Sequence, residues 1–422
     1  MHRLAFSLAF ALAASTAFAA DPLPRAKPET VGMSSAALAR IGETIEADVQ
    51  KGRLPGAVVA VARKGKLVYY RAFGFQDKDA GTKMTTDSIF AIASMTKPIV
   101  AVAALTLNER GQMNFDDPVG RYLPQFGKQQ VAVLRANDGG AGYDLVAAAR
   151  QPNILDLMRH TSGMSYGGRG ATAVHKMYPG SSNSSGQTLT GEEFLAKLAA
   201  APLLHQPGST WDYSFGLDVL GLAIERVSGK TLGAYFDEQI FRPLGMTDTV
   251  FVVPADKAKR IAKAFKIDPE NGQPQSVPDR TQPLKFECGG GCLASTAGDY
   301  LRFAQMLLNG GQLDGKRVAG RKNIEYMLSN HLAPGTVNLI GLTDPSNADM
   351  GFGLGLAVRT TEGVVRTAGS IGTASWSGAF GTYWWIDPKE KLAAVYMVQT
   401  PGMIRRQQRY VFNALVNQAI ID

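Results

Sequence analysis

A serine and a lysine three residues apart form the pattern in this chain that most clearly suggests catalytic chemistry. The stretch Ser94–Lys97 is an S-x-x-K tetrad, and an apolar, alanine-rich helix is expected over 92–109. Residues three apart share one face of a helix. A neutral lysine on that face can take the proton of the serine hydroxyl and make it a nucleophile. We therefore expect Ser94 to be a nucleophile and Lys97 its base.

Tyr213 is a candidate partner for this pair. It precedes Ser214 and lies between the Pro207-Gly208 turn and an expected helix. A tyrosine close to a cationic lysine can relay protons to and from a serine or a leaving group. The spacing along the chain does not by itself bring Tyr213 to Ser94.

The stretch Trp376-Ser377-Gly378-Ala379 is a candidate wall of the same site, at the start of a strand expected to run to Ile386. Glycine lets the backbone approach a ligand closely. A backbone N–H on such an edge strand could face a substrate carbonyl and, with that of Ser94, form an oxyanion hole.

A second serine motif competes with Ser94. Residues 163–167 match G-x-S-x-G around Ser165, the pattern of the nucleophile elbow of lipases. That elbow requires a strand before the serine and a helix after it. Here a short helix precedes Ser165 and a glycine-rich stretch follows, so we expect Ser165 to be a coincidental match.

Composition and charge describe an ordinary globular protein of 422 residues, with a net charge of +8. The basic residues are scattered, and the densest group is Arg405, Arg406 and Arg409, ahead of an apolar helix. We expect these three to form a solvated basic face and predict no nucleic-acid partner. The five histidines lack ligand spacing with the two cysteines, so no metal site is predicted. Cys288 and Cys292 flank three glycines and could form a disulfide or remain free thiols.

Residues 1–19 have the features of a secretory signal peptide. Arg3 precedes an apolar run over 4–12, and Ala17-Phe18-Ala19 resembles a cleavage site. The run is short for a transmembrane anchor. We expect a periplasmic or secreted protein without stable membrane insertion.

The pattern of elements indicates one α/β (α+β) unit. Two strands are expected over 56–62 and 67–73, joined at a Lys64-Gly65 turn, after a helix over 35–49. Residues 116–280 read as mostly helix and loop, with a flexible loop over 181–186. Further strands are expected over 354–358, 363–367, 378–386 and 392–399, before a last helix. Residues 20–115 and 281–422 would then share one mostly antiparallel sheet, with the helical part, 116–280, beside it and a cleft between them.

The three motifs, in this order, resemble those of serine β-lactamase-related hydrolases. The chain is most similar to the family VIII carboxylesterases, which are similar in fold to class C β-lactamases. The resemblance implies a β-lactamase/DD-peptidase-like fold with an antiparallel sheet flanked by terminal helices. It also implies that Lys97 and Tyr213 share acid and base roles, and that the N–H groups of Ser94 and Ala379 hold an oxyanion. Water would hydrolyse an acyl-enzyme on Ser94, without a metal or organic cofactor.

Two departures from β-lactamases bear on the substrate. Phe215 stands where class C enzymes carry an asparagine, and offers only apolar contact. Trp376-Ser377-Gly378 stands where K-T-G would be, so the lysine that attracts a substrate carboxylate is missing. Loss of such a charge-assisted contact costs roughly 1.5–3 kcal/mol, or about ten-fold to over a hundred-fold in affinity.

We therefore expect hydrolysis of neutral esters with short acyl or aryl groups. A β-lactamase or D-amino-acid peptidase, an acyltransferase, and a penicillin-binding sensor without turnover remain alternatives. The oligomeric state is not readable from the sequence.

Overall fold

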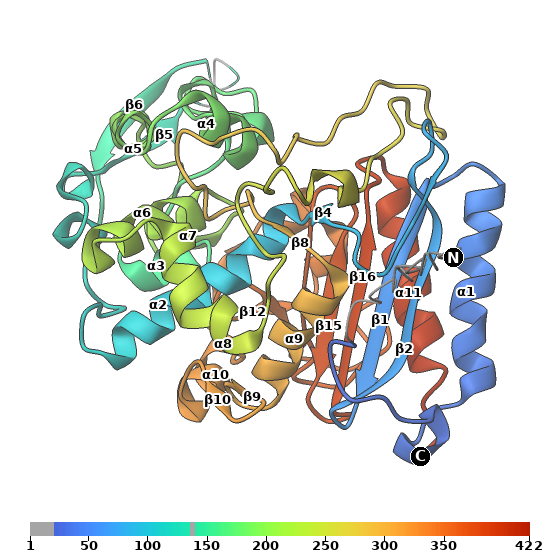
Figure 1. Ribbon diagram of the computed structural model, residues 1–422. Helices are drawn as coiled ribbons and strands as arrows, with labels where there is room; N and C mark the ends of the chain where they lie inside the picture. Colours follow the sequence, from blue (N-terminus) through green and yellow to red (C-terminus); the bar gives the residue numbers. More distant parts are fainter. Residues whose placement is uncertain (1–20, 136–138, 140) are drawn as a thin grey trace, which may run out of the picture.

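A large antiparallel sheet joins the two ends of the chain in the computed structural model, which describes residues 21–135, 139 and 141–422 (Figure 1). The expected signal peptide at 1–19 lies outside the described residues. Within them the sheet has eight strands, in the order β12-β13-β14-β15-β16-β1-β2-β3. The strands are β1 (Gly56–Arg63), β2 (Lys66–Asp77), β3 (Thr82–Lys83), β12 (Gly351–Phe352), β13 (Ala357–Val358), β14 (Ala374–Ser377), β15 (Tyr383–Asp387) and β16 (Leu392–Val398).

The central strands are apolar on both faces, which places them in the middle of the sheet. Every residue of β1 and β16 is buried, and Val59 of β1 lies opposite Tyr396 of β16. The β1–β2 hairpin turns at Lys64 and Gly65, both with positive φ. Two such residues in succession suit the tight turn that joins twisted antiparallel strands. The predicted hairpin is confirmed.

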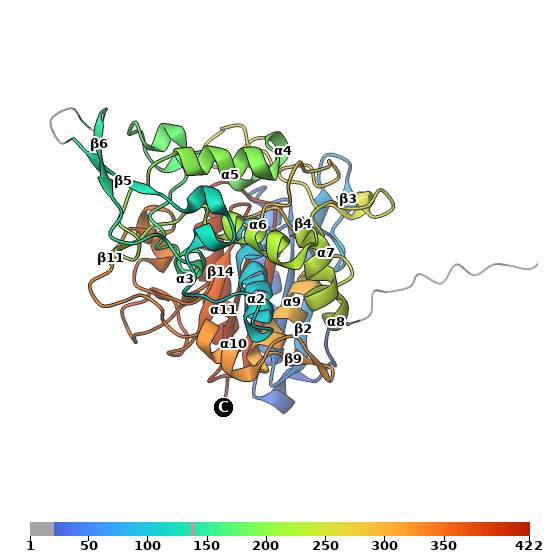
Figure 2. The same ribbon diagram turned by 90° about the vertical axis from the view of Figure 1, so that its left-hand side faces the viewer.

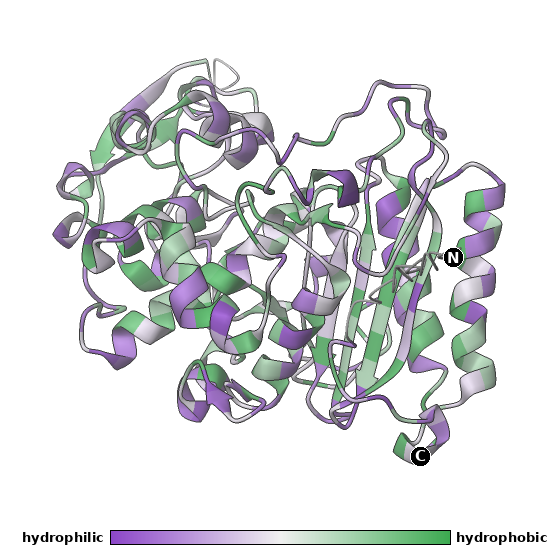
Figure 3. Ribbon diagram, viewed as in Figure 1, coloured by the Kyte–Doolittle hydropathy of each residue, from purple (hydrophilic) through white to green (hydrophobic). Residues whose placement is uncertain are grey.

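Helices cover both faces of the sheet. The helices α1 (Ser35–Gln50) and α11 (Ile404–Asn417) pack on one face, where their apolar sides meet β1, β2 and β16 (Figures 1 and 3). The helix α9 (Ala297–Leu308) packs on the other face. The predicted mixed α/β fold, an antiparallel sheet flanked by terminal helices, is confirmed.

The helix α2 (Thr96–Glu109) lies between the sheet and the helical part of the molecule (Figure 2). Its residues from Thr96 to Leu107 are all buried, as its alanine-rich sequence predicts. The helical part is built from α3 (Ile154–Met158), α4 (Ser182–Thr188), α5 (Gly191–Ala200), α6 (Gly216–Ser228), α7 (Leu232–Phe236) and α8 (Arg242–Leu244), with α10 (Arg321–Met327) beside α2.

Short strand pairs also lie outside the large sheet. Of these, only the pair β7–β11 is parallel. The strands are β4 (Phe90–Ala91) with β8 (Ala294–Ser295), β5 (Gln130–Leu134) with β6 (Tyr143–Ala147), β7 (Thr210–Trp211) with β11 (Val337–Asn338), and β9 (Gln312–Leu313) with β10 (Lys316–Arg317).

Several local expectations were wrong. The loop expected over 181–186 is largely helix α4, because Ser181 caps its start by accepting from the N–H of Ser184. Residues 363–367, all described, contain no strand. The strand expected over 378–386 begins only at Tyr383, since a turn follows the end of β14. The β5–β6 hairpin within 116–280 was not anticipated.

Two kinds of feature are absent from the part of the chain that the structure describes. It contains no helix with the length and apolar character needed to cross a membrane. It also contains no group of three or more histidine, cysteine, aspartate or glutamate side chains able to hold a metal ion.

Candidate active site

Ser94 lies on a single 3₁₀ turn, η2 (Ala93–Met95), which leads directly into α2. The residue before it, Ala93, has a φ of 45°, a conformation that is costly for a residue with a side chain. The hydroxyl of Thr96 donates to the Ala93 carbonyl at 2.7 Å and holds this turn in place. The strained turn exposes Ser94 at the start of a buried helix.

The three residues predicted to do chemistry meet at the Ser94 hydroxyl. The phenol oxygen of Tyr213 lies 2.6 Å from Ser94 Oγ, and Lys97 Nζ lies 3.3 Å from the same atom. Lys97 Nζ also lies 4.5 Å from the centre of the Tyr213 ring. Both neighbours donate to Ser94 Oγ, so either one, once deprotonated, is placed to take the proton of Ser94 without a large movement.

Lys97 is held by a backbone carbonyl that the sequence did not point to. Its side chain is only 1% exposed, and Nζ donates to the Gly290 carbonyl at 2.5 Å. The N–H of Gly290 in turn donates to Asp218 Oδ1 at 2.8 Å. Burial raises the pKa of Asp218, although the charge of Lys97 opposes this. Gly290 lies between Cys288 and Cys292, which are joined by a disulfide.

His160 supports the segment that carries Tyr213, and sequence reasoning missed it. Its ring centre lies 4.6 Å from that of Tyr213, and Nδ1 accepts from the N–H of Ser214 at 3.2 Å. Burial lowers the pKa of His160 well below its usual value, and the charges of Lys97 and Arg169 add to the effect. A neutral imidazole can accept the Ser214 bond at Nδ1.

The stretch after β14 borders the Ser94 turn, and Gly378 is what allows this. A Cβ on Gly378 would lie 2.5 Å from the carbonyl oxygen of Ile92, two residues before Ser94. Arg409 donates to the Gly378 carbonyl at 2.7 Å. Since the peptide is trans, the N–H of Ala379 points away from Arg409. The strand β13 pairs with β14 only at Ala374 and Ser375, so the end of β14 has an open edge.

One cavity brings most of the predicted residues together. It holds about 520 Å³ of space, part of it open to solvent. Two further segments, at 340–347 and 405–409, contribute the rest of the lining. The predicted site residues on its wall are Ser94, Tyr213, Trp376, Ser377, Gly378 and Ala379.

Phe215 does not belong to this wall. Its side chain is 0% exposed and packs between Tyr166, with ring centres 4.0 Å apart, and Phe194, at 5.2 Å. It therefore forms part of the core beneath the site and does not line the cavity where an apolar contact with a substrate was expected.

The arginines expected on a solvated basic face border the cavity instead. Arg409 is buried and pairs with Asp344 at 2.7 Å. Arg405 and Arg406 line the same cavity, and burial beside Arg409 lowers the pKa of Arg405 to about 10. The cavity thus has cationic groups although Trp376 replaces the lysine of K-T-G.

Ser165 has none of these relationships. It follows helix α3 and precedes a short 3₁₀ turn, so the strand–serine–helix geometry of a nucleophile elbow is missing. Its hydroxyl is buried and makes no hydrogen bond within the described structure. The geometry favours Ser94 over Ser165 as the nucleophile.

Comparisons with known proteins identify the family of this chain. The family model described as "Beta-lactamase" matches residues 41–417. Protein Rv1367c of Mycobacterium tuberculosis is 38% identical over 354 residues, 82% of this chain and 86% of that protein. Esterase EstB of Burkholderia gladioli is 32% identical over 399 residues, 88% of this chain and 93% of that protein.

Among solved structures, "EstCE1, a hydrolase with promiscuous acyltransferase activity" has a TM-score of 0.74. The match covers 92% of this chain and 99% of that one, and at 24% identity it shows a common fold. The sequence matches to Rv1367c and EstB are more specific evidence of family than this similarity in fold. On these findings, the chain belongs to the beta-lactamase family and is related to its esterase members.

Proposed function

We propose that this protein is an exported serine esterase that cleaves carboxylic esters through an acyl-enzyme on Ser94. The observation that carries the proposal is the position of the Ser94 hydroxyl, which lies within hydrogen-bond distance of Tyr213 and Lys97 at the wall of a cavity. The similarity to a protein named as an esterase supports ester substrates over other acyl compounds.

In the first half of the reaction, Ser94 Oγ attacks the ester carbonyl carbon while its proton passes to Lys97 or Tyr213. The carbonyl oxygen becomes an oxyanion, which the N–H groups of Ser94 and Ala379 would hold. The bond to the alcohol then breaks, and the alcohol leaves with a proton from Tyr213 or Lys97.

In the second half, water attacks the acyl carbon and gives its proton to the same base. The bond to Ser94 breaks, the carboxylic acid leaves, and the proton returns to Ser94 Oγ. Lys97 and Tyr213 therefore act as base and acid in turn, so no proton is gained or lost by the enzyme over one cycle.

The lining of the cavity supports short acyl or aryl esters. Trp376 is 4% exposed, and its ring lies 5.9 Å from that of Tyr213, so both aromatic side chains can contact a small acyl or aryl group. Without a lysine at position 376, β-lactams would bind weakly at this point, and we expect at most slow β-lactam hydrolysis.

A panel of p-nitrophenyl esters of graded acyl length, assayed beside nitrocefin, tests the proposal. We expect turnover of short esters by the wild-type protein, loss of nearly all activity in Ser94→Ala, and little change in Ser165→Ala. Loss of activity in Ser165→Ala with retention in Ser94→Ala would overturn the assignment, as would faster turnover of nitrocefin than of any ester.

The fate of the acyl group separates hydrolysis from its alternatives. An acyl adduct on Ser94 that persists in mass spectra without turnover would indicate a penicillin-binding sensor. A product ester formed with an added alcohol would indicate acyl transfer. Export is tested separately, by N-terminal sequencing of the protein from the periplasm or medium, where we expect a mature chain beginning near Ala20.

A further inference from the structure

The disulfide loop over 288–292 meets the amine of Lys97. The carbonyl of Gly290 at its centre accepts from Lys97 Nζ at 2.5 Å. The Cα atoms of Cys288 and Cys292 lie 5.3 Å apart, and both side chains are fully buried. Closing so short a loop limits the conformations open to the three glycines inside it.

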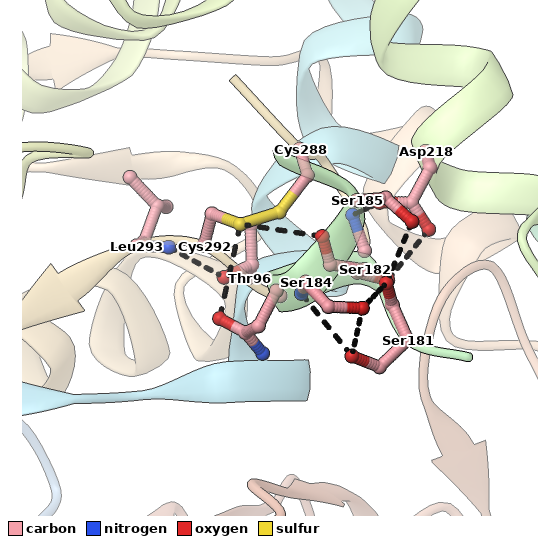
Figure 4. Close-up of a disulfide and its surroundings, with 12 residues drawn as sticks. Thr96, Ser181, Ser182, Ser184, Ser185, Asp218, Cys288, Cys292 and Leu293 are labelled. Atoms are coloured by element: carbon pink, nitrogen blue, oxygen red, sulfur yellow. Dashed lines mark hydrogen bonds between the residues drawn. A yellow bond between two sulfur atoms is a disulfide. The ribbon is translucent and has the colours of Figure 1, made fainter. Parts of the chain in front are cut away.

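Asp218 holds the same loop from the opposite side. This residue lies in the first turn of α6, five positions after Tyr213. Its carboxylate accepts from the N–H of Gly290 and from the hydroxyl of Ser182, both at 2.8 Å (Figure 4 shows the Ser182 bond). A Cβ on Gly290 would lie 2.1 Å from Asp218 Oδ2, so the approach requires glycine there.

The bonds to Lys97 and to Asp218 belong to the two peptide units that flank Gly290. One uses the carbonyl of Gly290 and the other its N–H, so together they fix both of its backbone torsions. Without these two hydrogen bonds, Gly290 could turn its carbonyl in many directions, because glycine has few backbone restrictions. A fixed carbonyl keeps the amine of Lys97 beside Ser94.

The end of the loop is also tied to the turn that carries Ser94. The N–H of Leu293 donates to Thr96 Oγ1 at 3.2 Å, and its carbonyl accepts from the N–H of Ile92 at 3.0 Å (Figure 4 shows the Thr96 bond). The loop therefore connects α6, which follows Tyr213, with the start of α2. It touches the supports of all three reacting residues.

We propose that Asp218 is a positioning residue for Lys97, acting through Gly290 in the disulfide-closed loop. The proposal rests on the proposed esterase function, because it assigns Lys97 the role of base. A buried carboxylate is costly unless its hydrogen bonds are made, and here they orient the base. The titratable groups that act on its pKa are Lys97, through its charge, and Tyr166, through a hydrogen bond.

Two substitutions separate orientation from charge. Asp218→Ala removes both hydrogen bonds, and we expect kcat to fall by about ten-fold or more, with KM changed by less than about two-fold. Asp218→Asn keeps an acceptor for Gly290 but removes the negative charge. We expect a smaller loss in kcat, and a low-pH limb of the kcat/KM profile displaced to lower pH because the site has one negative charge less.

A matched control is Asp299→Asn, which neutralises another buried carboxyl that accepts from the N–H of Asp248 and the hydroxyl of Thr249. We expect it to keep the wild-type kcat and pH profile. A second variant, Cys288→Ala with Cys292→Ala, opens the loop without affecting any other cysteine, since the chain has two. We expect it to lower kcat in the same direction as Asp218→Ala.

Each outcome decides between the explanations. If Asp218→Ala fails to fold, as judged by circular dichroism, Asp218→Asn and the double cysteine variant carry the test. Wild-type kcat and pH profile in the folded Asp218 and cysteine variants would overturn the proposal, even if their melting temperatures fell. Absence of ester turnover by the wild-type protein would instead contradict the proposed function.

Discussion

The phenol oxygen of Tyr213 lies 2.6 Å from Ser94 Oγ, closer than the amine of Lys97 at 3.3 Å. The Tyr213 ring also packs against His160 and Trp376, which fixes its direction. The structure thus holds the phenol of Tyr213 in direct contact with the hydroxyl of Ser94, the proposed nucleophile, so removal of the phenol oxygen should affect the chemical step of the proposed reaction.

Tyr213→Phe removes this hydroxyl and retains the ring. We expect kcat to fall by about 10²–10⁴-fold, the usual worth of a positioned acid or base, while KM and the melting temperature change little. Steady-state kinetics on a short p-nitrophenyl ester provide the measurement. A loss below about ten-fold would assign the proton transfers to Lys97 alone.

Phe215 offers a contrasting prediction, because it is buried among aromatic rings and does not line the cavity. Phe215→Ala leaves a void in the core, and we expect the free energy of unfolding to fall by about 3–5 kcal/mol. Urea unfolding measures this loss, and Phe215→Leu, which refills much of the space, should lose less. A large rise in KM with unchanged stability would show that Phe215 contacts substrate after all.

The sequence could predict that Ser94 and Lys97 form a pair, but it could not predict where the side chain of Phe215 lies. Ser94 and Lys97 could be paired because their chemistry requires a local spacing on one helix. The position of Phe215 after Tyr213 could not predict which way its side chain points. A family motif gives the residue type at a position, whereas packing with Tyr166 and Phe194 decides its direction.

Contacts between distant parts of the chain were missed for a similar reason. Gly290 and Asp218 are 72 residues apart, and Arg409 and Asp344 are 65 residues apart. No periodic pattern connects such pairs. From the sequence alone, the arginine group was therefore interpreted as a solvated face, and the three glycines were interpreted as a plain loop. The strand order of the sheet was also beyond local patterns, although its antiparallel character was not.

The arginines at the cavity qualify the expected preference for neutral esters. Arg406 lines the cavity and donates to the carbonyl of Thr343 at 3.3 Å, and part of its side chain is exposed. Arg406→Gln should lower kcat/KM for a p-nitrophenyl hemisuccinate by about two- to ten-fold, a range suited to a partly solvated charge contact. The uncharged butyrate ester should change by less than about two-fold.

A control for this comparison removes a cation elsewhere on the surface. Arg226→Gln deletes an exposed arginine that pairs with Glu192, and should leave the ratio of the two kcat/KM values unchanged. The effect of Arg406→Gln should also shrink at high salt, because screening weakens exposed charge contacts. Equal losses for both esters would show that Arg406 shapes the cavity and does not recognise charge.

The last prediction concerns Asp299, whose pKa is raised to about 6 by burial, with a smaller contribution from the charge of Asp248. In the unfolded chain its pKa returns to about 3.8, so the folded protein binds this proton more tightly. Its contribution to stability is complete below about pH 4 and is lost as the pH rises through about 6. The total is roughly 3 kcal/mol, since one pKa unit corresponds to about 1.4 kcal/mol.

Asp299→Asn removes this titration and leaves all other groups in place. We expect the difference in free energy of unfolding, variant minus wild type, to rise by roughly 3 kcal/mol between about pH 4 and about pH 7. Urea unfolding of both proteins measures this difference. Taking the difference between the two proteins cancels the titration of the groups that they share. A difference that stays constant over this range would mean that Asp299 has the same pKa in the folded and unfolded states, with its hydrogen bonds from Asp248 and Thr249 fully offsetting its burial.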